Sequence, residues 1–282
     1  MRRSQDTMTR LNAAISERFG EHISLPKDVL NADELARILE HRSHRAFTEK
    51  PVSEALLRFL FACALSAPSK SDLQQADIVW VVDPPAREAF ADLIPNMPWV
   101  HSAPVFLVFC ANNRRIRQIG EMRGKPFAND HLDAFINAAV DAAIVMTTFI
   151  RAATVVGLGC CPISAIRDHA KAVNRLLALP QWVFPVAGLC LGYPAREGQI
   201  SPRLPMDITV HVDRYSEDGL QQKIEAYDQR RHVQQPITKQ RYVELYGSAA
   251  FYGWSEDKAR HYSRPERADF GRYIREKGFN LE

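Results

Sequence analysis

The segment His41-Arg42-Ser43-His44-Arg45-Ala46-Phe47 places two arginines, two histidines and a serine directly before an aromatic residue. Pro51 follows closely, so one helix is expected to end near His41 and another to begin beyond the proline. Such a segment can bind an anion, because arginine offers forked N–H donors and serine a hydroxyl donor. The alternative is a solvated helix end, where the helix dipole favours basic side chains. Residue spacing alone slightly favours the solvated helix end.

Hydrophobic spacing on both sides of this segment predicts helices that alternate with strands. An amphipathic helix is predicted over 4–19. Asn31 is expected to cap a second helix, and Ser53 a third that stops at Ala67 because the residue before a proline avoids helical geometry. Further helices are predicted over 84–94, over 131–156, between residues 164 and 180, and near 218–230 and 264–277. Strands are predicted over 77–83, 104–110, 157–163 and 184–194.

Two segments have distinctive composition. The predicted helix over 131–156 is apolar nearly all round, which is typical of a helix in the centre of a core or an interface. Its residues Asp141 and Arg151 argue against a membrane span. The stretch 112–130 is charged and contains two glycines, and it is predicted to be a mobile loop or lid. The alternation of strands and helices predicts an α/β or α+β class.

The composition argues against several classes of protein. The 282 residues are 46% hydrophobic and 24% charged, as in ordinary globular proteins. The net charge of +3 is too small to indicate a nucleic-acid surface. No apolar run predicts a membrane span and no secretory signal is recognised, so a cytoplasmic protein is expected. The five cysteines lie in apolar runs without metal-binding spacing, so free thiols and no metal site are predicted.

Anion binding remains the main chemical signal, because recognisable catalytic motifs are lacking. The sequence contains no Gly-rich dinucleotide fingerprint, no phosphate-binding P-loop and no His-Glu-x-x-His metal motif. The cluster 41–45, together with the distant Arg203, suits a phosphate group. Ser69, Ser71 and Gln74 lie in a polar loop, where they are turn residues first and ligand contacts second.

Several short motifs, taken in order, resemble the FMN-dependent nitroreductase family. Residues 41–47 with Pro51-Val52-Ser53 resemble its opening motif, and residues 67–74 resemble its second flavin loop. Gly157-Leu158-Gly159 resembles the start of the third. Later segments resemble the subgroup of major oxygen-insensitive NADPH nitroreductases and flavin reductases: residues 177–180, 188–195, 202–205, 263–265 and 277–279. The resemblance spans roughly residues 33–282 and leaves an N-terminal extension.

This resemblance implies an α+β fold with three layers, α/β/α, in which a mixed sheet is flanked by helices. It also implies an intertwined homodimer with non-covalent FMN at the interface. The chain would comprise a helical extension over 1–30, an FMN-binding core over 31–210, and a C-terminal tail over 211–282 that packs on the dimer partner.

The resemblance also implies which residues bind the cofactor. Arg42, Ser43 and Arg203 would hold the FMN phosphate, while His41 and Arg45 would line the ribityl and pyrimidine end. Arg45 would stabilise the negative charge of the reduced flavin. The remaining implied contacts are Ser69, Ser71 and Gln74 in one loop, Met97, Pro98 and Trp99 in another, and Pro162, Ile163, Ser164 and Ala165 along the isoalloxazine, with the Ser164 backbone N–H near flavin N5. No catalytic side chain is implied, because the flavin performs the hydride chemistry.

The implied activity is that of an oxidoreductase, a flavoprotein that uses NADPH or NADH to reduce nitroaromatics, quinones or flavins by ping-pong hydride transfer through flavin N5. One alternative keeps the fold and FMN but performs ene reduction or reductive dehalogenation. A further alternative is a flavin-binding dimer without turnover. The partners implied are a second copy of the chain and a small-molecule electron acceptor, with neither nucleic acid nor membrane.

The sequence departs from the subgroup at three places. Ser201 stands where subgroup members carry a lysine, two residues before the phosphate arginine. Ser164-Ala165 replaces a glycine pair beside the flavin. The arginine-rich loop for the NADPH 2′-phosphate has no clean counterpart, although Lys239 and Arg241 could substitute for it. An aromatic segment there, which could shape a specialised acceptor pocket, contains Phe251, Tyr252 and Trp254.

Overall fold

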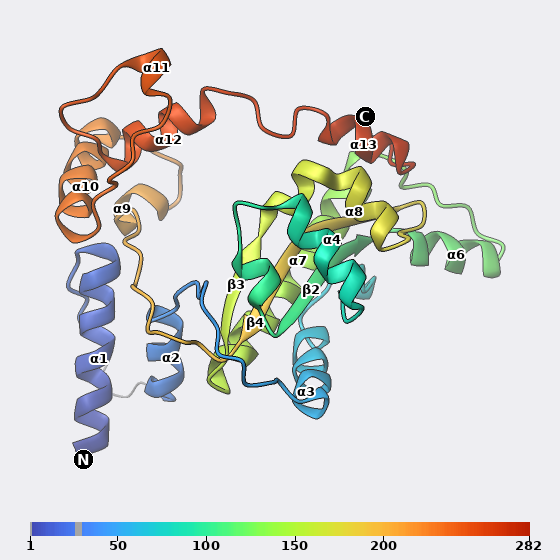
Figure 1. Ribbon diagram of the computed structural model, residues 1–282, viewed down its shortest axis with the longest axis horizontal. Helices are drawn as coiled ribbons and strands as arrows, with labels where there is room; N and C mark the ends of the chain where they lie inside the picture. The colour runs from blue at the N-terminus through green and yellow to red at the C-terminus, as the bar shows by residue number, and fades with distance from the viewer. Residues whose placement is uncertain (1, 26–29) are drawn as a thin grey trace. The chain divides into compact units, whose positions relative to one another are not determined.

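The computed structural model describes residues 2–25 and 30–282 and divides the chain into two compact units (Figure 1). The first unit comprises residues 1–42 and 199–266, and the second comprises residues 43–198 and 267–282. The predicted segments 1–30, 31–210 and 211–282 divide the chain by sequence instead, and those boundaries stay predictions.

The second unit is built on a four-stranded antiparallel sheet with the strand order β1-β2-β4-β3. The strands are β1 (Ala76–Trp80), β2 (Val105–Asn112), β3 (Gly159–Ile163) and β4 (Val183–Gly192). Every residue of β2 is buried, which confirms that the apolar run 104–110 is covered on both faces. The α+β class is confirmed. Among the described residues, the parallel pairing expected of a mixed sheet is a single bridge between Ser43 and Cys160.

Helices cover both faces of this sheet and make the predicted three layers. One face carries α3 (Glu54–Leu65), α7 (Leu132–Val155) and α13 (Phe270–Glu276); the other carries α4 (Pro84–Leu93), α5 (Trp99–Ser102), the 3-10 helix Ser164–His169 and α8 (Ala170–Leu176). Side chains alternate between the faces along each strand. Leu107 and Phe109 therefore join the core under α3 and α7, while Phe106 and Val108 join the core on the opposite face.

Local capping chemistry explains where several helices begin. The Ser53 hydroxyl accepts a hydrogen bond from Leu56 N at 3.3 Å, as predicted. Asp83 caps α4 by accepting from Ala86 N at 3.1 Å. Asn31 does precede α2 (Ala32–Leu39), but its side chain makes no capping bond, so that part of the prediction is wrong. Its φ of 53° is left-handed, a conformation that asparagine tolerates better than most residues.

Residues 114–122 of the stretch 112–130 form helix α6 (Arg114–Met122), so the prediction of a loop is wrong there, whereas residues 123–130 form neither helix nor strand. The side chain of Asn112 accepts a hydrogen bond from Arg115 N at 3.0 Å and completes the first turn. Arg117 pairs with Asp130 at 2.5 Å, and its guanidinium lies 4.7 Å from the centre of the Trp182 ring. These contacts fasten a charged helix that has few apolar residues.

Helix α7 is long and apolar enough to cross a membrane by length and composition alone. In the described part of the chain it is the one helix with this property. It nevertheless packs on the sheet, where its residues Ala138, Val145 and Phe149 join the core. Its buried Asp141 hydrogen-bonds a neighbouring loop. Helix α7 is therefore a core helix, as predicted.

The described elements of the first unit are all helices: α1 (Arg2–Phe19), α2, α9 (Met206–Thr209), α10 (Leu220–Gln234), α11 (Val243–Tyr246) and α12 (Trp254–Tyr262). The predicted helices over 4–19 and near 218–230 are confirmed by α1 and α10. Helix α1 packs along α2, where Arg10 pairs with Glu40 at 2.7 Å and with Asp33 at 3.2 Å. Helix α12 was missed because its sequence is largely polar.

Candidate functional site

Arg18, Arg42 and Arg203 come together in the first unit from three separate segments. The backbone N–H of Arg203 donates to the Arg18 carbonyl at 2.6 Å, and Arg18 Nη2 donates to the His41 carbonyl at 2.6 Å. Burial, and after it the charges of Arg203 and Arg42, lower the pKa of Arg18. Arg203 and Arg42 thus lie close enough for their charges to act on Arg18. Such a group of fork-shaped donors suits an anion, and phosphate above all.

The backbone that carries Arg203 is held by three guanidinium groups. Arg18 donates to the Ser201 carbonyl at 3.3 Å, Arg231 to the Pro202 carbonyl at 3.1 Å, and Arg230 to the Arg203 carbonyl at 2.7 Å. Three consecutive carbonyl oxygens are therefore occupied by donors from α1 and α10. The residues predicted for the phosphate, Arg42 and Arg203, are brought together with Ser201. The contribution of Arg18 was missed, because it occurs in an extension that resembles no motif.

A second group of predicted residues lies beside edge strand β3 in the second unit. Ser43 pairs with Cys160, and His44 N donates to the Cys160 carbonyl at 2.9 Å. The Arg45 guanidinium lies 5.6 Å from the centre of the Trp99 ring. The buried indole Nε1 of Trp99 has no hydrogen-bonded oxygen or nitrogen in the described part of the chain. Arg45 and Trp99 thus place a cation and an N–H donor at one site.

The same group includes the Cys161 thiol and the segment that follows it. Burial raises the pKa of Cys161, while the charge of Arg45 and hydrogen bonds from Trp99 and Arg45 act in the opposite direction. Beyond it, Pro162 and Ser164 are exposed, whereas Ile163 and Ala165 are buried. Ser164 opens a 3-10 helix, so its backbone N–H precedes the first intrahelical hydrogen bond and can serve an external acceptor.

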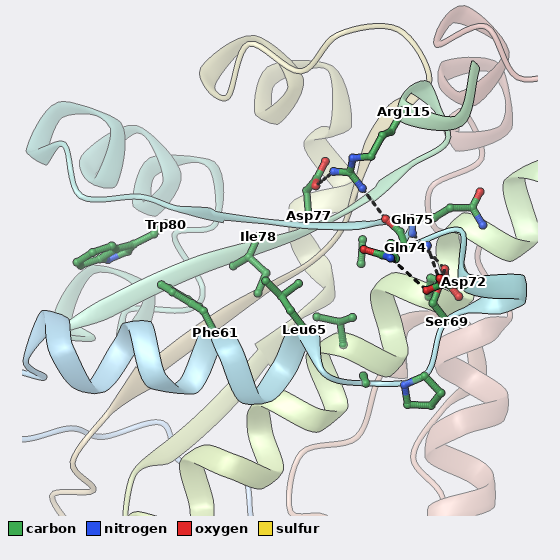
Figure 2. Close-up of a pocket in the computed structure, with 15 residues that line it drawn as sticks. Phe61, Leu65, Ser69, Asp72, Gln74, Gln75, Asp77, Ile78, Trp80 and Arg115 are labelled. Carbon is green, nitrogen blue, oxygen red and sulfur yellow. Dashed lines mark hydrogen bonds and ion pairs between the residues drawn. The ribbon is translucent and has the colours of Figure 1, made fainter. Parts of the chain in front are cut away.

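The loop 69–75 (Figure 2) forms a third group. It is organised by the buried carboxylate of Asp141. Asp141 accepts from Ser69 Oγ at 2.7 Å, from Lys70 N at 3.0 Å and from Gln75 N at 3.2 Å. The Ser69 hydroxyl also accepts from Gln74 N at 2.7 Å. The predicted ligand Ser69 is thus engaged within the loop, whereas Ser71 and Gln74 are exposed. The role of Asp141 was missed, because it appeared only as a charge interrupting an apolar helix.

The backbone of this loop adopts conformations that non-glycine residues rarely take. Ser71, Asp72 and Gln74 have φ angles of 49°, 56° and 52°. Each left-handed residue costs on the order of 1 kcal/mol or more, and such strain persists where surrounding contacts fix it. The contacts here come from Asp141 and from Arg115. Arg115 donates to the Gln74 carbonyl and pairs with Asp77 (Figure 2).

A cavity of about 800 Å³ lies beside this loop. Its apolar wall includes Phe61, Leu65 and Trp80, and its polar wall includes Gln74 and the Asp77–Arg115 ion pair (Figure 2). A cavity with an apolar wall and a few polar groups is typical of small-molecule sites.

The second and third groups lie at opposite edges of the sheet. Ser43, Arg45 and the segment 162–165 adjoin edge strand β3, whereas the loop 69–75 leads into edge strand β1. With neighbouring strands about 4.8 Å apart, the two edge strands of a four-stranded sheet are on the order of 14 Å apart. A single chain therefore does not bring all of the predicted cofactor residues to one point.

The aromatic segment in the first unit has a structural role. Tyr252 is buried; its hydroxyl accepts from Arg241 N at 2.9 Å and donates to Asp257 at 3.1 Å. Trp254 packs edge-on against Tyr227, with ring centres 5.3 Å apart. Arg241, considered above as a substitute cation for the NADPH phosphate, is paired with Asp257 at 3.1 Å. Phe251 is the more exposed ring of this segment and lies 5.1 Å from the ring of His232.

Comparison with known proteins agrees with this architecture. A model described as "Nitroreductase family" matches residues 38–193, and one described as "Nitroreductase family, C-terminal domain" matches residues 201–282. The chain is 32% identical over 248 residues to a protein of Bacillus subtilis (strain 168) named as an FMN reductase with NAD(P)H. That alignment covers 87% of this chain and 97% of the relative.

Two further similarities extend the comparison. An oxygen-insensitive NADPH nitroreductase of Salmonella typhimurium is 37% identical over 191 residues, which cover 67% of this chain and 77% of the relative. The solved structure of Bacillus megaterium NfrA2 superposes with a TM-score of 0.80 at 31% identity, covering 89% of this chain and 99% of that one. The match extends over both units of the chain, and the chain belongs to the nitroreductase family.

Proposed function

We propose that the protein is an FMN-dependent oxidoreductase that takes reducing equivalents from NADPH or NADH and passes them to a nitroaromatic, a quinone or a flavin. The relatives named as FMN reductase and NADPH nitroreductase support this activity. The observation that carries the proposal is the convergence of Arg42 and Arg203 around Arg18. The sequence motifs predict both residues as ligands of the FMN phosphate, and phosphate is the anion that their forked donors fit.

The residues present fit FMN in their donor chemistry as well. Arg42 and Arg203 would bind the phosphate. Arg45, which lies 5.6 Å from the centre of the Trp99 ring, would stabilise negative charge at the pyrimidine end. The Ser164 backbone N–H would serve the N5 edge. FMN, when bound, supplies the hydride chemistry, so the side chains bind and orient it without acting as acid or base.

We further propose that the active form is a cytoplasmic homodimer. The predicted cofactor residues lie at opposite edges of one sheet, and a second copy could supply the loop 69–75 to the group around Arg45. In such a site NAD(P)H and the electron acceptor would occupy the same place in turn, which predicts ping-pong kinetics. The buried free thiols are in keeping with a reducing compartment.

The test of this proposal begins with the purified protein. Extracted cofactor should be FMN, and anaerobic mixing with NADPH or NADH should bleach the flavin absorbance. The double substitution Arg42→Gln and Arg203→Gln should yield colourless protein, because it removes the cations assigned to the phosphate. Arg37→Gln, an exposed residue on α2, is the matched control and should retain the cofactor. Failure of both nicotinamides to bleach the flavin would refute the activity, and stoichiometric FMN in the double variant would refute the phosphate assignment.

Parallel rate measurements identify the acceptor class. Initial rates with a nitroaromatic, a quinone and free FMN at equal concentration should rank the three. Parallel lines in double-reciprocal plots are expected for each productive acceptor, because oxidised product leaves before the acceptor binds. Intersecting lines would contradict the shared site.

A further inference from the structure

Helix α1 places one buried cation directly behind the arginines assigned to the phosphate. Arg18 is 7% exposed and lies in the last turn of α1, whose Leu11, Ala14 and Ile15 are also buried. It lies before the first family match, which begins at residue 38. Arg18 is therefore a feature of the extension, not of the matched region.

The guanidinium of Arg18 joins the two segments that carry Arg42 and Arg203. Its Nε donates to the Leu39 carbonyl at 2.8 Å and its Nη2 to the His41 carbonyl at 2.6 Å. Its Nη1 donates to the Ser201 carbonyl at 3.3 Å, while its own carbonyl accepts from Arg203 N at 2.6 Å. One residue thus fixes the chain immediately before Arg42 and on both sides of Pro202. A planar guanidinium can hold three such acceptors at once, which an ammonium group cannot do with the same geometry.

We propose that Arg18 is a positioning residue for FMN, holding Arg42 and Arg203 so that both cations converge on the phosphate. This inference rests on the proposed function. The N-terminal extension then belongs to the cofactor site and is more than a surface addition.

The charge arrangement favours this role over simple helix docking. Helix α1 already has a separate attachment to α2, through the pairs that Arg10 makes with Asp33 and Glu40. Arg18 adds a third positive charge beside Arg42 and Arg203; burial, and after it the charges of these two arginines, lower the pKa of Arg18. A residue selected only to dock the helix gains nothing from that repulsion, whereas an anion bound there would reverse it.

The test compares FMN with riboflavin, which lacks the phosphate. Apo-protein is titrated with each flavin, and binding is followed by the quenching of flavin fluorescence. The ratio of the two dissociation constants reports the phosphate contacts and is insensitive to the rest of the flavin pocket. Arg18→Gln should weaken FMN binding about tenfold or more, as expected for lost charged hydrogen bonds, and change riboflavin binding by less than about twofold. Arg18→Lys should lose much of the FMN preference too, because lysine keeps the charge but not the fork.

The matched control is Arg10→Gln, which removes the ion pairs between α1 and α2 but leaves Arg18 in place, and it should keep the FMN preference. An unchanged preference in Arg18→Gln overturns the inference, and so does an equal loss of FMN and riboflavin affinity, which indicates general misfolding of the pocket. If Arg18→Lys keeps the full preference for FMN over riboflavin, the guanidinium geometry of Arg18 does not position the phosphate ligands and the inference is overturned. Arg18→Lys alone tests the inference if Arg18→Gln does not fold. Wild-type protein that binds neither flavin refutes the proposed function itself, which separates that failure from the failure of the inference alone.

Discussion

At the scale of single residues, two buried charged side chains organise what the exposed ones would bind. Arg18 fixes the segments around Arg42 and Arg203, and Asp141 fixes the loop that carries Ser69 and Gln74. Both are charged groups that satisfy several backbone partners at once. A buried charge is tolerated when its hydrogen bonds are complete, so each residue holds the neighbouring backbone in one conformation.

The contribution of the Asp141 carboxylate to stability can be measured directly. Asp141→Ala should lower the free energy of unfolding by about 2–4 kcal/mol, because the Ser69 hydroxyl and the N–H groups of Lys70 and Gln75 lose a charged acceptor. Urea unfolding measures the change, and hydrogen exchange should show faster exchange in the loop 69–75. Asp133→Ala on the same helix removes a bond from Asn137 alone and should change stability by less than about 0.5 kcal/mol. Equal effects of the two substitutions would contradict the assigned role.

The buried thiols predict how stability responds to alkaline pH. Burial raises the pKa of Cys110 from 9.0 to about 12 and also raises the pKa of Cys160 and Cys190. The folded state therefore keeps these protons while the unfolded chain releases them above about pH 9. Stability should be unaffected by these thiols below that pH and should fall above it, by up to about 1.4 kcal/mol per pH unit for each thiol.

Urea unfolding at several alkaline pH values checks this expectation. Cys190→Ala should reduce the slope of the free energy of unfolding against pH by the contribution of one thiol, since alanine has no proton to release. A wild-type slope that does not steepen above pH 9 would show that the thiols ionise in the folded state as well.

At the scale of elements, periodicity predicted most helices and the central strands correctly. The run 104–110 and helix α7 were recognisable because burial on all sides leaves a continuous apolar sequence. Helix α6 was missed because its stability comes from contacts with Asn112, Asp130 and Trp182, which lie outside its own sequence. The capping bond of Ser53 was predictable, whereas the left-handed backbone of Asn31 was not, because the sequence alone permits both conformations.

Only some residues of the candidate site could be predicted from the sequence. Arg42 and Arg203 could be assigned through their motifs. The partner Arg18 could not, because its role depends on how the extension packs against residues 39–41 and 201–203. Asp141 is similar: its sequence context is an apolar helix, and its three donors come from a loop far away in the chain.

Helix α6 offers a test at this scale. Its amides should exchange more slowly than those of the segment 123–130 that follows, because they are hydrogen-bonded within an anchored helix. Hydrogen exchange with mass spectrometry resolves the two segments. Asp130→Asn should speed exchange in α6 by removing the partner of Arg117, while Glu121→Gln on the exposed side should not. Equal fast exchange across 114–130 in the wild type would restore the mobile loop that composition indicated.

At the scale of the whole molecule, the second unit leaves apolar surface uncovered on the helices of one sheet face. Phe59 and Leu65 on α3 are 60% and 56% exposed, and Ile136 and Val140 on α7 are 43% and 48% exposed. These helices pack on the same core. Several large apolar side chains exposed on neighbouring helices are typical of a protein interface. These exposed side chains agree with the proposed homodimer. A homodimer would also explain why the predicted cofactor residues lie at two opposite edges of the sheet.

The dimer and the cofactor should therefore be lost together. Val140→Asp places a charge on the exposed side of α7, where burial against a second copy would leave it unpaired, so light scattering should show a shift from dimer to monomer. Because the loop 69–75 and the Arg45 group would then no longer meet, FMN occupancy should fall in parallel. Ile119→Asp, at a comparably exposed apolar residue on α6, is the control and should leave both properties intact. A monomeric Val140→Asp protein with full FMN occupancy would show that one chain completes the site, and the predicted residues at the β1 edge would then have to be assigned another role.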